Sequence, residues 1–161
     1  MLVVATALQL TSLPPRKAMQ ESYRKELLTG GGSLDTVTTL HNLSPLIGAA
    51  AGGHTPIVRM LVNAGADTRI QRTSDGYTAL HLALSVKNVE MAEMLLEDNR
   101  AIHLRAEGGH TALFLAALHG LSQLMDKLLD LGAEIDAQDQ QGYTALSRSA
   151  TRTPGDCKDF D

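Results

Sequence analysis

The sequence predicts an all-α repeat protein, a solenoid of stacked helix–turn–helix units joined by loops or β-hairpins. One motif returns three times, as Gly76-Tyr77-Thr78-Ala79-Leu80-His81-Leu82-Ala83, then over 109–116 and over 142–147. Its threonines lie 33 residues apart, and a looser copy places Ser44 34 residues before Thr78. An apolar segment of helical spacing follows each of the first two full copies. A fixed period of this length indicates a stack of repeated units rather than one closed core.

Composition agrees with thin stacked layers and excludes several classes of function. Hydrophobic residues make up 43% of the 161-residue chain, but aromatic residues only 3%. The net charge is −4 and basic residues are not clustered, so nucleic acid is not an expected partner. Cys157 is the only cysteine, which predicts an intracellular protein, cytoplasmic or nuclear, without a disulfide framework. No apolar run reaches the ~18 residues of a membrane span.

The N-terminal part, 1–32, has two open interpretations. It contains a faint echo of the motif at 6–10, a break at Pro14-Pro15, a helical pattern over 16–28 and a glycine stop at 30–32. This outline fits a degenerate first repeat, since a terminal repeat faces water on one side. An unrelated N-terminal extension fits equally well. A signal peptide is the weaker alternative, because the apolar segment 1–13 has no basic residue before it.

The repeat array is predicted over 33–152, with its first clear unit at about 42–74. That unit has a first helix at 43–51, a turn at 52–54 and a second helix at 57–64. Pro56 suits the first turn of a helix, and Gly65 ends it in a left-handed conformation. The polar connector 67–75 absorbs the one residue that exceeds the period.

Two more units and a partial one follow. The unit at about 75–107 has helices at 79–86 and 89–96, with Asn99 standing where Gly65 stood. The unit at about 108–140 has helices at 112–119 and 124–131 and closes with Gly132. The partial unit 141–152 has one helix, 144–152, which Pro154 ends. The polar C-terminal tail is 153–161.

These residues resemble ankyrin repeats. The resemblance rests on Thr78-Ala79-Leu80-His81, Gly53-His54, the segment 128–133 and the segment 139–144, all at the family's spacings. It covers about residues 42–150. The family's histidine in the first helix is present only as His81, its counterparts being Ile47, Phe114 and Ser147. The connector 100–108 lacks the family's aspartate, so we expect an irregular hairpin there.

The resemblance implies a non-enzymatic, monomeric protein-interaction module. In the family, connector tips and the exposed side of the first helices form a concave binding face, and tyrosine is favoured at binding hot spots. Matching one repeat to the next gives the candidate partner-binding residues: Arg69, Gln71, Arg72, Ser74, Tyr77, Ser85, Arg105, His110, His119, Gln138, Gln140 and Tyr143.

No constellation of residues predicts catalysis, a metal site or a cofactor. The six histidines show no metal-ligand spacing, and no nucleophile elbow surrounds Ser147. No Gly-Lys-Ser/Thr follows the glycines at 30–32, so they are not a phosphate loop. The main alternative to a self-sufficient module is an ankyrin segment of a larger regulatory protein whose activity lies elsewhere. An enzyme is the weakest hypothesis.

Overall fold

The computed structural model describes residues 44–150, so the predictions for 1–32 and for the tail lie outside the described residues. Seven α-helices fall within this range, together with one short 3-10 turn, η1. Their bounds are α3 Pro45–Ala51, α4 Thr55–Asn63, α5 Ala79–Ser85, α6 Val89–Leu96, η1 Glu107–Gly109, α7 Ala112–His119, α8 Ser122–Asp130 and α9 Ala145–Ala150.

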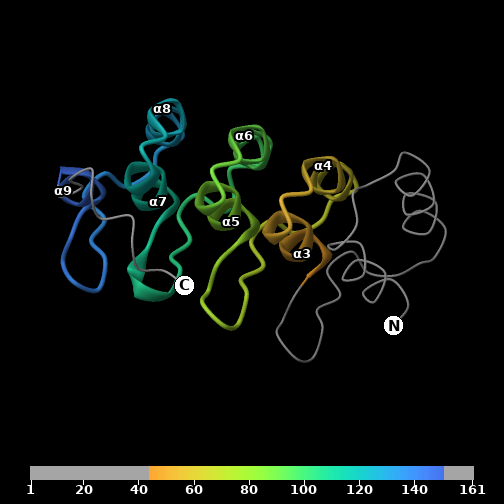
Figure 1. Ribbon diagram of the computed structural model, residues 1–161, viewed down its shortest axis with the longest axis horizontal. Coiled ribbons are helices and arrows are strands. Elements are labelled where there is room, and N and C mark those ends of the chain that lie inside the picture. The colour runs from red at the N-terminus through yellow and green to blue at the C-terminus, as the bar shows by residue number, and fades with distance from the viewer. Residues whose placement is uncertain (1–43, 151–161) are drawn as a thin grey trace.

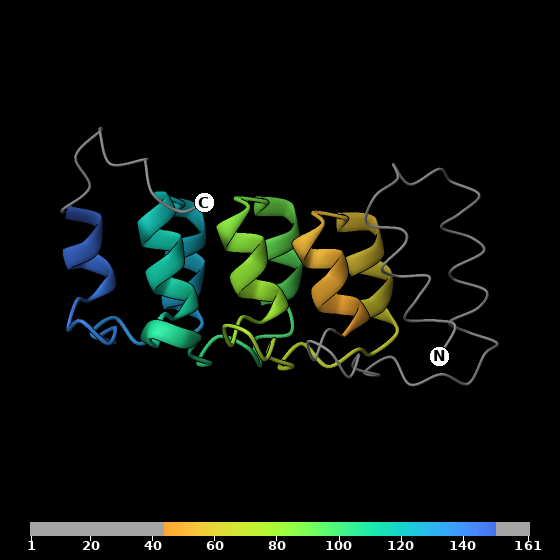
Figure 2. The same cartoon turned by 60° about the horizontal axis from the view of Figure 1, so that its bottom comes forward.

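The helices form two parallel rows, which confirms the predicted solenoid (Figure 1). The first helices α3, α5, α7 and α9 pack side by side in one row, and the second helices α4, α6 and α8 form the other. The helices α3, α5 and α7 each contact the second helix of their own repeat, and neighbouring helices also contact one another along each row. The connectors all project at the same edge of the stack (Figure 2). They are loops, with a single isolated β-bridge between Gln138 and Thr144 in the part that the structure describes.

Each first helix begins at the hydroxyl residue of the repeated motif. The Ser44 Oγ accepts a hydrogen bond from the Ile47 N–H at 3.2 Å, and the Thr111 Oγ1 accepts one from Phe114 at 3.2 Å. Thr144 repeats the contact with the N–H of Ser147 at 3.2 Å. Such caps satisfy N–H groups that have no partner within the helix. The motif therefore recurs because every unit needs the same helix start.

The helix bounds differ from the prediction at several ends. α3 begins at Pro45 rather than residue 43, because Ser44 is its cap. α4 begins at Thr55, two residues earlier than predicted, and α5 ends at Ser85. α8 spans Ser122–Asp130, so Leu131 lies outside the helix that it was predicted to line and is 39% exposed. Asn99 and Gly65 have positive φ angles of 47° and 89°, as predicted.

Small residues let the first helices approach one another closely. Ala49, Ala83 and Ala116 are buried at equivalent positions of successive first helices, at 5%, 0% and 0% exposure. Leu95 of α6 and Leu128 of α8 point from the second helices into the core and are 1% and 0% exposed. Since no repeat could bury this surface alone, the core runs along the stack and depends on neighbouring units.

Polar contacts join the second helices across the seams between repeats. Arg59 of α4 pairs with Glu90 of α6 at 2.9 Å, and Glu93 of α6 pairs with Lys127 of α8. The Asn88 side chain, which caps α6, donates to Thr55 Oγ1 at 2.9 Å. Between residues 44 and 150, no helix has the length and apolarity to cross a membrane.

Candidate partner-binding surface

Hydrogen bonds hold the first connector in one conformation. The Arg72 guanidinium donates to both carboxylate oxygens of Asp75, at 2.9 Å through Nε. The same carboxylate accepts from the Tyr77 N–H at 3.1 Å, while the Arg72 N–H donates to the Tyr77 carbonyl oxygen at 2.9 Å. Burial alone would raise the pKa of Asp75, but the Arg72 and Tyr77 hydrogen bonds outweigh it and hold that pKa below its usual value.

The third connector uses the same chemistry, and the second does not. The Asp139 carboxylate accepts from the N–H groups of Gln141 and Tyr143 at 2.9 and 2.8 Å. The second connector has no aspartate at this place and instead turns through η1, where Gly108 and Gly109 have φ angles of 82° and 80°. The irregularity expected from the missing aspartate is therefore present.

Backbone hydrogen bonds tie each connector to the next. The Glu107 N–H donates to the Asp75 carbonyl oxygen at 2.8 Å, and the Gln140 N–H donates to that of Gly108 at 2.8 Å. The Gln71 side chain adds a second tie, because its Nε2 donates to the carbonyl oxygens of Gly76 and Arg105, both at 2.9 Å. The connectors therefore form one cross-linked row along the edge of the stack, which we call the connector row (residues 67–77, 100–110 and 134–143).

Three aromatic rings occupy equivalent positions along this row. Tyr77 lies half-buried against His81, with ring centroids 5.6 Å apart. His110 stacks on Phe114 at 4.8 Å, and burial lowers the pKa of its imidazole. Tyr143 is 40% exposed, and the Arg148 guanidinium lies 5.2 Å from the centroid of its ring. Of the three side chains only Tyr143 is exposed, and Tyr77 and His110 are partly buried.

His81 has a structural role inside the first helix α5. It is completely buried, and its Nδ1 accepts a hydrogen bond from the Thr78 N–H at 3.3 Å. The His81 N–H in turn donates to Thr78 Oγ1, which completes a capping box. Burial lowers the pKa of His81 to about 4, although the backbone carbonyls of His110 and Leu104 act in the opposite direction.

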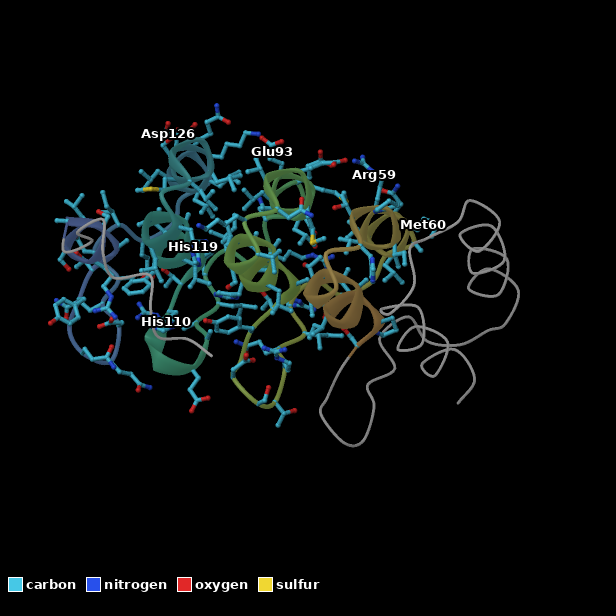
Figure 3. All side chains as sticks on the ribbon, in the orientation of Figure 1. Arg59, Met60, Glu93, His110, His119 and Asp126 are labelled. Carbon is cyan, nitrogen blue, oxygen red and sulfur yellow. The ribbon has the colours of Figure 1, made fainter. Side chains whose placement is uncertain are left out.

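The structure separates the predicted site residues into two groups. The polar side chains of the first group form hydrogen bonds or ion pairs within the protein. Arg69 pairs with Asp67, and Ser85 donates to the His81 carbonyl oxygen. Arg105 pairs with Glu134 and donates to the Gln138 carbonyl oxygen. Gln71 and Arg72 belong to this group through the contacts described above. Ser74, Gln138 and Gln140 lie exposed on the connectors, whereas the half-buried His119 ends α7 at the other end of the first helices (Figure 3).

Three polar residues that shape this surface were not among the predicted site residues. Asp75 and Asp139 organise the connector tips, and Asp98 accepts a hydrogen bond from Thr68 of the preceding repeat at 2.5 Å. Asp75 and Asp139 could have been found, because each lies shortly before a Gly-Tyr-Thr segment, where a carboxylate can accept from turn N–H groups. Nothing in the local sequence of Asp98 indicates a partner 30 residues away.

The connector row combines a shallow hollow with exposed side chains at its tips. Over residues 44–150, no group of three or more His, Cys, Asp or Glu side chains could hold a metal ion. A shallow hollow of about 560 Å³ at Arg105, Glu134–Ala137 and Gln138 lies open to solvent. The tips of the connector row carry the exposed side chains of Ser74, Gln140 and Tyr143.

Stacked helix pairs with cross-linked connectors define the chain as a repeat protein of the ankyrin type, and comparison with known families agrees. A model described as "Ankyrin repeats (3 copies)" matches residues 19–106, and one described as "Ankyrin repeat" matches residues 108–140. The chain belongs to the ankyrin repeat family.

Two curated relatives match a shorter part of the chain. They carry the name NF-kappa-B inhibitor cactus, from Drosophila yakuba and Drosophila melanogaster, and each is 38% identical over 56 residues. The match covers 35% of this chain but only 12% and 11% of those two proteins. The likeness is therefore confined to about an eighth or less of the relatives' length.

Proposed function

We propose that this chain is a non-enzymatic protein-interaction module that binds a partner protein through its connector tips and the concave side of its first helices. The observation that carries the proposal is the connector row. Its backbone is fixed by the bonds from Glu107 to Asp75 and from Gln140 to Gly108, while Ser74, Gln140 and Tyr143 stay exposed. A preformed surface loses little conformational entropy on binding, which favours affinity.

The relatives' name supports a regulatory role for this binding. Cactus is named as an inhibitor of NF-kappa-B, and it is 38% identical to this chain over 56 residues. We propose that this chain regulates a protein partner by occupying part of its surface, as an intracellular monomer. The proposal requires no cofactor, and neither nucleic acid nor a membrane is part of it.

A second candidate is that the repeats are one segment of a larger regulatory protein. The small fraction of the relatives' length that matches, 12% and 11%, favours it, because those proteins contain much more than this repeat segment. The full-length transcript decides between the candidates. A reading frame that continues past Asp161 into another domain supports the segment, and a stop codon there supports the self-sufficient module.

The test compares affinity capture by three forms of the full chain. Tyr143→Ala combined with Gln140→Ala removes two exposed tips of the third connector, and both side chains are dispensable for the core. Gln123→Ala, exposed on the outer face of α8, is the matched control. We expect at least one protein to be retained by the wild type and the control and lost from the double variant, with unchanged circular dichroism. Equal retention by all three forms would refute the connector row as the binding site.

A further inference from the structure

The Asp139 carboxylate in the third connector is buried, and its two oxygens have different surroundings. Its Oδ1 accepts from the N–H groups of Gln141 and Tyr143 at 2.9 and 2.8 Å. Its Oδ2 is buried and has no hydrogen-bond partner in the part of the chain that the structure describes. In the first connector Asp75 also accepts from a tyrosine N–H, but the Arg72 guanidinium binds both of its oxygens. A buried carboxylate oxygen without such a partner attracts a positive charge that can reach it.

Backbone contacts bring His110 of the second connector close to this carboxylate. The Gln140 N–H donates to the Gly108 carbonyl oxygen at 2.8 Å, and a Cβ on Gly109 would lie 3.1 Å from the Asp139 Cα. His110 follows directly, on the connector side of α7 (Figure 3). Its Nδ1 is also buried, without a hydrogen-bond partner within residues 44–150. The seam between the two connectors therefore separates two buried polar atoms of complementary chemistry.

The His110 imidazole has less room to move than the carboxylate. Its ring stacks on Phe114 with centroids 4.8 Å apart, and a Cβ on Gly108 would lie 3.0 Å from Cε1 and 3.4 Å from Nδ1. The Asp139 carboxylate is held instead by two N–H groups of the connector tip 140–143, whose residues are all exposed. An attraction between the two side chains would therefore move the connector tip rather than the ring.

The groups around His110 decide when it binds a proton. Burial lowers the pKa of the imidazole, Asp139 raises it, and Arg148 of α9 lowers it. His81 of α5 also interacts with His110, but its own pKa is lowered to about 4, so it stays neutral while His110 titrates. Glu107, the charged residue of η1, is exposed. His110 is therefore neutral at neutral pH, and acid shifts the population towards any conformer in which the imidazolium reaches the carboxylate.

We propose that protonation of His110 draws the Asp139 carboxylate into an ion pair with Nδ1 across the seam and frees the two N–H groups that this carboxylate holds. The tip of the third connector then changes its conformation. The first connector keeps its own, because Arg72 already neutralises the carboxylate there. The shape of the connector row therefore depends on pH at one of its three connectors. The consequence for a partner, which would meet a differently placed Tyr143 in acid, rests on the proposed function.

The test follows the full chain by NMR between about pH 8 and about pH 5, the range in which histidines titrate. We expect the His110 Cε1–H resonance and the amide resonances of Gln141 and Tyr143 to share one midpoint below 6.5. The hydrogen-exchange protection factors of those two amides should fall about ten-fold across it, the scale of one hydrogen bond to a charged group. The Tyr77 amide, which donates to Asp75, is the internal control and should keep its protection factor.

Four variants of the full chain separate this coupling from a general effect of acid. His110→Tyr introduces the residue that both neighbouring repeats have at this position and should abolish the titration of the two amides. Asp139→Asn removes the attraction and should lower the His110 midpoint. Asp136→Asn neutralises an exposed carboxylate of the same connector and should leave that midpoint unchanged. His103→Gln removes an exposed histidine of the second connector and should leave the titration of the amides unchanged.

Three results would overturn the proposal. One is an imidazole that stays neutral down to about pH 5, and another is a titration of the third-connector amides that persists in His110→Tyr. The third is an equal loss of protection at Tyr77, which would assign the change to a general loosening of the stack. Because Asp139→Asn keeps an acceptor oxygen for the connector N–H groups, the coupling is measurable even where His110→Tyr fails to fold. None of these measurements uses a partner, so their failure is distinct from that of the affinity capture.

Discussion

Thr78 and His81 close a reciprocal pair of hydrogen bonds at the first turn of α5, inside the core. The Thr78 hydroxyl accepts from the His81 backbone N–H, and the His81 Nδ1 accepts from the Thr78 backbone N–H at 3.3 Å. An Nδ1 that accepts from an amide must be unprotonated. Folding therefore requires a neutral imidazole at this position, which agrees with its pKa being lowered to about 4 by burial.

Acid should destabilise the fold through His81. The folded-state pKa of about 4 lies below the unfolded value of 6.5, so the unfolded chain binds the proton first. The contribution of neutral His81 to the free energy of unfolding is about 3 kcal/mol. It is fully present above pH 6.5 and is lost as the pH falls through about 4. Urea unfolding across this pH range should show a steeper loss of unfolding free energy for the wild type than for His81→Phe. Phenylalanine is the residue that the next repeat has at the equivalent position, Phe114. Parallel pH profiles would contradict the assignment.

Removing the helix caps should cost unequal amounts of stability. Thr111→Ala deletes one hydrogen bond, to Phe114, and should lower the free energy of unfolding by about 1 kcal/mol. Thr78→Ala also deprives the buried His81 Nδ1 of its hydroxyl partner at 2.8 Å, so its cost should rise to about 2 kcal/mol. Chemical denaturation measures both. Thr73→Ala, exposed in the first connector, is the control and should stay within about 0.5 kcal/mol of the wild type.

Gly109→Ala should be more damaging than Gly132→Ala, although both glycines have a positive φ angle. A Cβ at residue 109 would lie 3.1 Å from the Asp139 Cα and 3.1 Å from the Gln140 backbone nitrogen, where the connectors meet. A Cβ at residue 132 meets nothing within 4 Å, so that variant should lose only about 1–2 kcal/mol from the left-handed backbone. Thermal unfolding ranks the two variants. Equal melting temperatures would show that the next connector can move away from residue 109 without a loss of stability.

The ion pair between Glu93 and Lys127 should contribute little to the free energy of unfolding. Its side chains are 41% and 51% exposed, so solvent screens the attraction. A double-mutant cycle with Glu93→Ala and Lys127→Ala should give a coupling free energy of about 0.2–1 kcal/mol, which about 0.5 M salt should largely remove. A coupling that salt leaves unchanged would mean that the pair is held by packing rather than by charge.

The sequence indicated the helices well, because their determinants are local. Thr78 and Thr111 cap the helices that follow them, and the apolar spacing of α6 and α8 needs no distant information. The site was harder to predict. Gln71 and Arg105 looked available for a partner, yet their side chains donate to carbonyl oxygens in the next connector. Such bonds depend on how one repeat packs against the next. The local sequence around Gln71 or Arg105 contains no information about this packing.

The regular ties between connectors also bear on how such a chain can change in evolution. The bonds from Glu107 to Asp75 and from Gln140 to Gly108 involve backbone atoms alone, so they do not depend on which side chains face each other. The single extra residue between Ser44 and Thr78 falls in a connector and leaves the helix starts in register. A gene duplication that adds one whole unit would recreate the same ties at both of its borders. Copy number can therefore vary while the surfaces of individual units diverge towards different partners.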